Sequence, residues 1–146
     1  MSIDYIVASL PALSFDSPPG ISEEKFLEIA GGKFDKSLAK WQDLSTQLKN
    51  AVALARGGAK WARVAKGCSV FWKSRILACF QEKDIAKRDE MLERVFWDAA
   101  GELIPPSSPL GEGALAAYYI RLGIATRRAA INRDAGRDAF NKLTDA

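Results

Sequence analysis

The sequence predicts an all-α protein, a compact bundle of about five helices that forms one domain over residues 1–146. Three observations support this prediction. Apolar residues recur at intervals of three and four along most of the chain, which is the spacing of a helix face. Alanine, leucine, lysine and glutamate, which favour helices, fill these periodic segments. Long two-residue alternation and Asn-Gly turns, which are typical of strands and hairpins, do not occur.

The chain begins with short elements. Residues 4–10 are apolar, and their spacing suits a short helix and a strand equally well. Residues 11–20 are rich in proline and glycine, which predicts an ordered loop because proline lacks an amide donor and restricts the residue before it. Ser22 is expected to cap the next helix, and the Gly31-Gly32 pair is expected to end it.

Two longer helices are expected in the middle of the chain. Asp35 should cap the first, whose apolar seam has one polar gap at Ser45 and stops before the glycine pair at 57–58. The next periodic segment runs from about residue 60 to 81. Gly67 marks a point where this helix could break, because glycine costs a helix about 1 kcal/mol relative to alanine. Its apolar seam comprises Trp61, Val64, Cys68, Phe71, Trp72, Ile76 and Cys79.

The last part of the chain predicts two more helices. Asp84 should cap one whose apolar residues continue to Leu103. A second ordered loop, rich in proline, serine and glycine, is expected over residues 104–113. The final long helix is expected over residues 113–134, with a break at Gly136 and a short terminal turn after it.

The composition excludes several classes of function. Histidine is absent and only two cysteines occur, which removes His-dependent triads, His-ligated zinc and Cys₄ zinc sites. The glycine-bearing stretches at 55–60 and 111–114 lack the spacing of a phosphate-binding loop. We therefore expect no catalytic residue, no metal and no cofactor. No apolar run reaches the ~20 residues of a membrane span, and the first ten residues do not have the pattern of a signal peptide.

Charge is distributed in blocks along the chain. Residues 49–81 contain seven basic residues and no acidic one, whereas residues 1–48 and 82–102 are both acidic on balance. Because like charges repel, each basic segment should lie beside acidic groups, either of this chain or of another molecule. The candidate partner-binding residues are Arg56, Lys60, Arg63, Lys66, Arg121, Arg127, Arg128 and Arg133.

Other classes of function remain open at this point. The aromatic residues interleaved with the basic segment 56–75 could stack nucleic-acid bases, but they coincide with the apolar seam and are expected in the core, so nucleic-acid binding is not favoured. An enzyme would have to rely on Tyr118, Tyr119 and carboxylates for acid–base chemistry. A generic helical adaptor that binds another protein agrees with the same observations.

Residues 5–28, YIVASLPALSFDSPPGISEEKFLE, resemble the N-terminal signature of a bacterial family of unassigned function. The signature consists of a tyrosine-led VASLP, then LSFD, a proline pair, and a helix that starts with Ser-Glu-Glu and ends in Phe-Leu. Residues 115–143 are similar to the closing helix of that family. The genes of the family lie among those for V/A-type ATPases, and its members resemble, more distantly, the C-type central-stalk subunit of these rotary motors (d-type in eukaryotes).

The resemblance implies a non-catalytic, all-helical subunit. Such a subunit couples the rotor shaft to the membrane ring during ATP-driven or ATP-synthesising ion transport. Its expected partners are the other V/A-type ATPase subunits of the central shaft and the membrane ring. Its expected location is cytoplasmic, peripheral to the membrane through those partners and without a membrane span of its own.

Overall fold

The computed structural model describes residues 2–58, 63, 65, 67 and 69–144. Within this part of the chain there are six α-helices and no strand, which confirms the all-α class predicted from the sequence. The elements are α1 (Ile3–Ser9), α2 (Glu23–Ala30), α3 (Asp35–Ala55), α4 (Val70–Cys79), α5 (Ile85–Ala100), the 3₁₀ turn η2 (Gly101–Leu103) and α6 (Glu112–Thr144).

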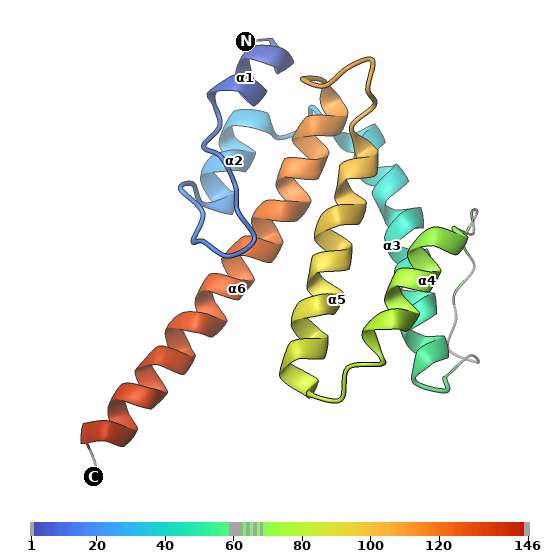
Figure 1. Ribbon diagram of the computed structural model, residues 1–146. Coiled ribbons are helices and arrows are strands. Elements are labelled where there is room, and N and C mark those ends of the chain that lie inside the picture. The colour runs from blue at the N-terminus through green and yellow to red at the C-terminus, as the bar shows by residue number, and fades with distance from the viewer. Residues whose placement is uncertain (1, 59–62, 64, 66, 68, 145–146) are drawn as a thin grey trace.

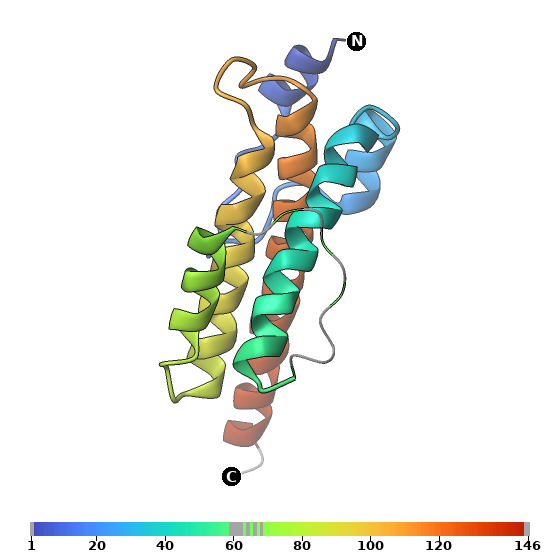
Figure 2. The same ribbon diagram turned by 90° about the vertical axis from the view of Figure 1, so that its right-hand side faces the viewer.

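The three longest helices, α3, α5 and α6, form the frame of the molecule (Figure 1). α4 packs against α3 and α5 on one side, and α1 and α2 pack against the first half of α6 on the other. The helix α6 contains 33 residues, which corresponds to a length of about 50 Å, and its C-terminal end projects beyond the other elements (Figures 1 and 2).

Two clusters of buried side chains hold the frame together. One lies between α1, α2 and α6, where Ile6, Phe26 and Leu115 are fully buried. The other lies between α3, α4 and α5, around Leu48 and Ile76. Burying each such side chain contributes about 1.5–3 kcal/mol, so the apolar periodicity of the sequence accounts for the packing of the helices.

Residues 4–10, whose spacing suited a helix and a strand equally, form most of helix α1. The predicted caps at Ser22 and Asp84 are confirmed. Ser22 Oγ accepts a hydrogen bond from the amide of Lys25 at 3.1 Å. Asp84 Oδ1 accepts one from the amide of Ala86 at 3.0 Å. Each bond satisfies an amide that the first turn of a helix leaves without a partner.

The predicted cap at Asp35 is wrong. Asp35 is already the first residue of α3, and Phe34 precedes it without a side-chain hydrogen bond to the helix end. The carboxylate of Glu112, at the start of α6, accepts a hydrogen bond from the amide of Ser37 at 3.2 Å. A residue 75 positions away in the sequence therefore fills the role predicted for Asp35.

The helix predicted over residues 60–81 is also wrong at the described residues of its first half. Residues 63, 65, 67 and 69 are not helical, and α4 begins only at Val70. Polar side chains of α3 bind the backbone here instead: Asn50 Nδ2 donates to the carbonyl of Arg63 at 2.7 Å, and Asn50 Oδ1 accepts from its amide at 2.8 Å. These bonds satisfy backbone groups that a helix would have used.

The residues of the apolar seam predicted for that segment differ in burial. Trp72, Ile76 and Cys79 are buried as predicted, but Phe71 is 62% exposed. Trp61, Val64 and Cys68 lie outside the described residues.

The predicted break at Gly136 does not occur. The helix α6 passes through Gly136 and continues to Thr144, and at its other end it includes the last two residues of the loop predicted over 104–113. One glycine costs a helix about 1 kcal/mol relative to alanine, which is too little to end a helix whose neighbouring residues favour it.

Candidate partner-binding groove

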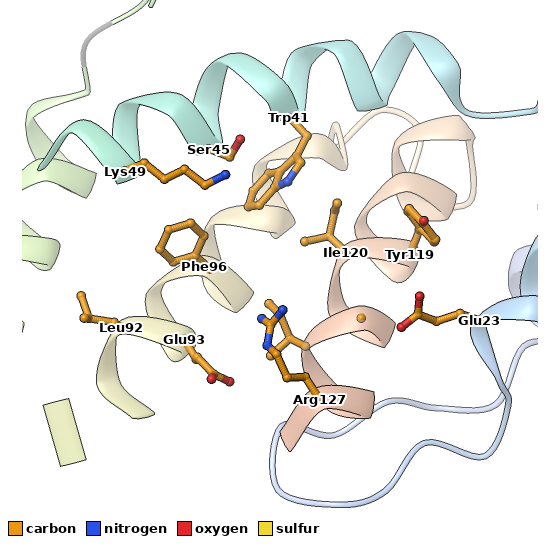
Figure 3. A pocket seen from close by; sticks show the side chains of 12 residues that line it. Glu23, Trp41, Ser45, Lys49, Leu92, Glu93, Phe96, Tyr119, Ile120 and Arg127 are labelled. Carbon is orange, nitrogen blue, oxygen red and sulfur yellow. The ribbon is translucent and has the colours of Figure 1, made fainter. Parts of the chain in front are cut away.

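The helices α3 and α6 diverge on either side of α5 (Figure 1). A groove lined by residues of all three helices lies there (Figure 3). It encloses a hollow of about 410 Å³. Its floor and walls are largely apolar and come from all three helices. The apolar residues that line this α3–α5–α6 groove are Trp41, Leu92, Phe96, Ile120 and Ile124.

Packing and a glycine together keep the groove open. The rings of Trp41 and Phe96 meet edge to face, with centroids 6.5 Å apart and an interplanar angle of 72°, so α3 and α5 are held together at the floor. Gly123 lies on the wall formed by α6. The nearest atom to a Cβ at this position would be Glu23 Oε1, at 3.9 Å, so nothing fills the space beside Gly123.

Charged side chains border the apolar surface. Lys49 of α3 and Arg127 of α6 extend towards the hollow from opposite walls, and Glu23 and Glu93 lie at its other edges (Figure 3). Within the described part of the chain, neither Lys49 nor Arg127 forms an ion pair or a hydrogen bond. Two cations without an ion pair among the described residues and two carboxylates therefore border the apolar surface.

Glu93 lies at the groove and is partly enclosed by the protein. Its Oε2 atom is buried without a hydrogen-bond partner among the described residues, and the nearest cation is Arg128, whose Nη1 is 4.0 Å away. Glu93 therefore belongs mainly to the ionic cluster of Arg128, at the edge of the groove.

Arg128, a candidate partner-binding residue, makes contacts inside its own chain. Its side chain is only 14% exposed. Its Nε atom donates a hydrogen bond to the carbonyl of Phe15 at 2.9 Å, and its Nη2 atom lies 3.3 Å from Glu90 Oε1 and 3.5 Å from Asp16 Oδ1. This basic residue is neutralised by acidic neighbours of the same chain, which is one of the two outcomes that the charge pattern allows.

Arg121 is also used inside the fold. Its Nε atom donates a hydrogen bond to the carbonyl of Trp97 at 3.0 Å, and its guanidinium lies 5.5 Å from the centroid of the Trp97 ring. Burial lowers the pKa of Arg121 from its ordinary value. Arg121 therefore ties α6 to α5.

The other candidate residues do not gather at one place. Arg56 is exposed and lies over the ring of Phe80 at 5.8 Å. Arg63 is exposed and bound through its backbone to α3. Arg133 is exposed near the end of α6, on the side away from the groove, and Lys60 and Lys66 lie outside the described residues. Among the predicted residues that the structure describes, only Arg127 lines the groove.

Lys49, Trp41 and Phe96 are parts of the groove that the sequence did not predict as parts of a site. One signal was present. Trp41, Ser45 and Lys49 recur at intervals of four and so share one face of α3. The polar gap at Ser45 in an otherwise apolar seam indicated a face that the fold does not cover completely.

Of the acid–base groups considered above, Tyr119 and the carboxylates of Glu23 and Glu93 line the groove. In the described ranges, no group of three or more histidine, cysteine, aspartate or glutamate side chains could hold a metal ion. The phenol of Tyr118, one of the acid–base groups considered above, lies away from the groove and donates a hydrogen bond to the carbonyl of Pro11 at 2.6 Å. None of the helices described is both long enough and apolar enough to cross a membrane.

A scan against protein-family models finds no match to the chain, and searches of curated proteins and of solved structures find none either. The groove and the sequence itself are therefore the grounds for a proposed function.

Proposed function

We propose that the protein is a non-catalytic helical subunit that binds an amphipathic helix of a partner protein in the α3–α5–α6 groove. The observation that carries this proposal is the combination of an apolar floor with Lys49 and Arg127 on opposite walls, neither of which forms an ion pair among the described residues. Grooves between helices commonly bind an amphipathic helix through its apolar face. The partner helix should place apolar side chains on Trp41 and Phe96 and acidic side chains beside the two cations.

The resemblance of residues 5–28 and 115–143 supports a more specific form of the proposal, in which the partners are V/A-type ATPase subunits. The two segments become α1, α2 and most of α6, and their side chains meet in one cluster that includes Ile6, Phe26 and Leu115. When two segments that are far apart in the sequence both resemble the same family, we expect them to pack against each other in the fold. In this form the protein acts like the C-type central-stalk subunit, holding the central shaft to the membrane ring from the cytoplasmic side.

The test is co-purification of the tagged full-length chain with V/A-type ATPase subunits. The wild type should retain subunits of the central shaft or the membrane ring, and the K49E/R127E variant should lose them because both cations of the groove become acidic. Arg133→Glu reverses one charge, as Arg127→Glu does, on an exposed residue of α6 that does not line the groove, and serves as the control for that single reversal.

The outcomes separate the general proposal from its specific form. If the chain retains proteins other than ATPase subunits, and K49E/R127E releases them, the groove binds a partner but the protein is a general adaptor. Retention that is equal for the wild type and K49E/R127E would rule out the groove as the binding site.

A further inference from the structure

A second hollow lies between α4 and α5, which pack side by side (Figures 1 and 2). It shares no lining residue with the α3–α5–α6 groove. Its volume of about 250 Å³ is below the roughly 300–1,000 Å³ of sites for drug-sized ligands, so any ligand must be small. The residues that line this α4–α5 hollow are Arg75, Ala78, Cys79, Met91, Arg94 and Val95.

Two guanidinium groups from the facing helices share one carboxylate at this hollow. Arg75 Nη2 lies 3.0 Å from Asp98 Oδ2, and Arg94 Nε lies 3.3 Å from Asp98 Oδ1. Each arginine uses one nitrogen in these pairs, so its remaining N–H donors have no partner among the described residues. The side chains of Arg75 and Arg94 are 34% and 49% exposed, which leaves these donors accessible to a ligand.

The charge around this pair is positive. A third arginine, Arg121, lies close by: burial lowers its pKa, the charge of Asp98 raises it and the charge of Arg94 lowers it. Three arginines therefore surround the single carboxylate of Asp98, which leaves a surplus of two positive charges. Among the residues that the structure describes, no acidic one lines the hollow.

The other carboxylates of this region bind groups elsewhere. Glu90 and Glu93 bind Arg128, and Glu102 accepts a hydrogen bond from Trp72 Nε1. None of the acidic residues of α5 lines the hollow. The positive surplus is therefore not cancelled at the hollow itself, whereas the α3–α5–α6 groove is bordered by charges of both signs.

The rest of the lining is apolar. Ala78, Met91 and Val95 contribute most of it, and Met91 is 40% exposed, so a ligand can reach its side chain. The thiol of Cys79 donates a hydrogen bond to the carbonyl of Arg75 at 3.3 Å and is satisfied within the fold. A ligand that fills the hollow would thus combine an anionic group with a short apolar part.

We propose that the α4–α5 hollow binds the phosphate monoester of a small organic molecule. At neutral pH this group carries about −1.5 to −2 charges and three acceptor oxygens, which match the positive surplus and the free donors. A carboxylate carries a single charge and would leave about half of the surplus without a counter-charge. The phosphate lies on the guanidinium groups of Arg75 and Arg94, and the apolar part of the ligand lies on Met91 and Val95.

Calorimetric titration of the full-length chain with phenyl phosphate tests the proposal, and NMR shifts of backbone amides locate the binding. Phenyl phosphate should bind more tightly than inorganic phosphate, which lacks the ring, and more tightly than benzoate, which carries a carboxylate instead. Amide signals of α4 and α5 beside the hollow should shift. Added salt should weaken the binding, because it screens partly exposed charges.

Arg75→Ala and Met91→Glu should each raise the dissociation constant of phenyl phosphate by at least about tenfold. The first removes donors to the phosphate, and the second places an acidic group on the apolar lining. Because Met91 is partly exposed, Met91→Glu tests the site even if Arg75→Ala fails to fold. Lys73→Ala is the matched control, since it removes one positive charge from an exposed position of α4 that does not line the hollow.

A wild type that gives neither heat nor amide shifts with phenyl phosphate overturns the proposal, and so does binding that Arg75→Ala and Met91→Glu both leave unchanged. Equal affinity for benzoate would overturn the choice of a phosphate, and equal affinity for inorganic phosphate would overturn the organic part of the ligand.

The α4–α5 hollow is independent of the proposed function, because it has no residue in common with the groove. K49E/R127E should therefore bind phenyl phosphate as the wild type does. If the wild type binds phenyl phosphate but retains no partner protein, the hollow is a binding site and the proposed function fails. The reverse result leaves the proposed function standing without this site.

Discussion

Arg128 and Phe15 are joined twice, once through the ring and once through the backbone. The guanidinium carbon of Arg128 lies 3.8 Å from the centroid of the Phe15 ring, and its Nε atom donates to the carbonyl of the same residue at 2.9 Å. Phe15 in turn meets Trp97 of α5 edge to face, with centroids 5.6 Å apart. The loop over residues 11–20 is therefore held between α5 and α6, close to the point where α6 leaves the bundle.

We predict that Arg128→Ala lowers the free energy of unfolding by about 2–3 kcal/mol, because it removes a charged hydrogen bond and a cation–π contact together. Arg128→Lys should recover only part of the loss, since lysine lacks the planar group that makes both contacts. Arg127→Ala, at the exposed neighbouring position, should change the stability by less than about 0.5 kcal/mol. Urea denaturation of the three variants gives the comparison. Equal losses for R128A and R127A would mean that Arg128 does not hold the loop.

The elements that the sequence predicted well depend on local interactions. Ser22 and Asp84 each cap the helix that follows them directly, so the residues that make the bond stand two or three positions apart. The cap at Asp35 was wrong because the group that binds the start of α3 is Glu112, brought there by the packing of α6. Nothing near Asp35 in the sequence indicates that contact.

The groove likewise combines features that the local sequence predicts with features that only tertiary packing determines. The sequence placed Trp41 and Phe96 on apolar helix faces, and both faces do pack. The divergence of α3 and α6 that leaves them beside a hollow is a tertiary property, set by α1, α2 and α4 around the frame. Charge patterning likewise identified Arg127 and Arg128 together, and only the structure separates the residue that faces the groove from the one that holds the loop.

The environment of Tyr118 should make the folded protein less stable at alkaline pH. Its ring stacks on Phe26, with centroids 5.3 Å apart, and its hydroxyl donates to the carbonyl of Pro11 at 2.6 Å. Burial raises the pKa of Tyr118 above its ordinary value of about 10. The unfolded chain therefore ionises Tyr118 at a lower pH than the folded chain does. The stabilisation from the neutral phenol is complete below pH ~10 and is lost as the pH rises through the folded pKa.

We therefore expect Tyr118→Phe to be less stable than the wild type at neutral pH, by about 1 kcal/mol for the lost hydrogen bond. The difference should narrow as the pH rises above ~10, because only the wild type has the Tyr118 phenol to ionise, whereas Tyr5 and Tyr119 are common to both proteins. Burial also raises the pKa of Cys79, but this thiol is common to both proteins and cancels in the comparison. Denaturant midpoints at a series of pH values give the measurement. A difference that stays constant with pH would contradict the assignment to Tyr118.

Substitution of alanine for glycine should have opposite effects on stability at two positions of α6. A Cβ at Gly113 would overlap the carbonyl oxygen of Leu103 and crowd Pro105, so the start of α6 can approach η2 only with glycine at this position. At Gly136 no atom lies within 4 Å of the same point, and the helix continues through it. The same substitution should therefore destabilise the fold at one glycine and strengthen the helix at the other.

We expect Gly113→Ala to lower the free energy of unfolding by about 1–3 kcal/mol, the cost of overpacking a buried contact. Gly136→Ala should instead favour the helix locally by up to about 1 kcal/mol. Because residues 131–144 pack on nothing in the monomer, this gain should appear as slower amide hydrogen exchange within that segment, with little change in the global midpoint. If Gly136→Ala left exchange in residues 131–144 unchanged, the glycine would not be what limits the local stability of this helix end.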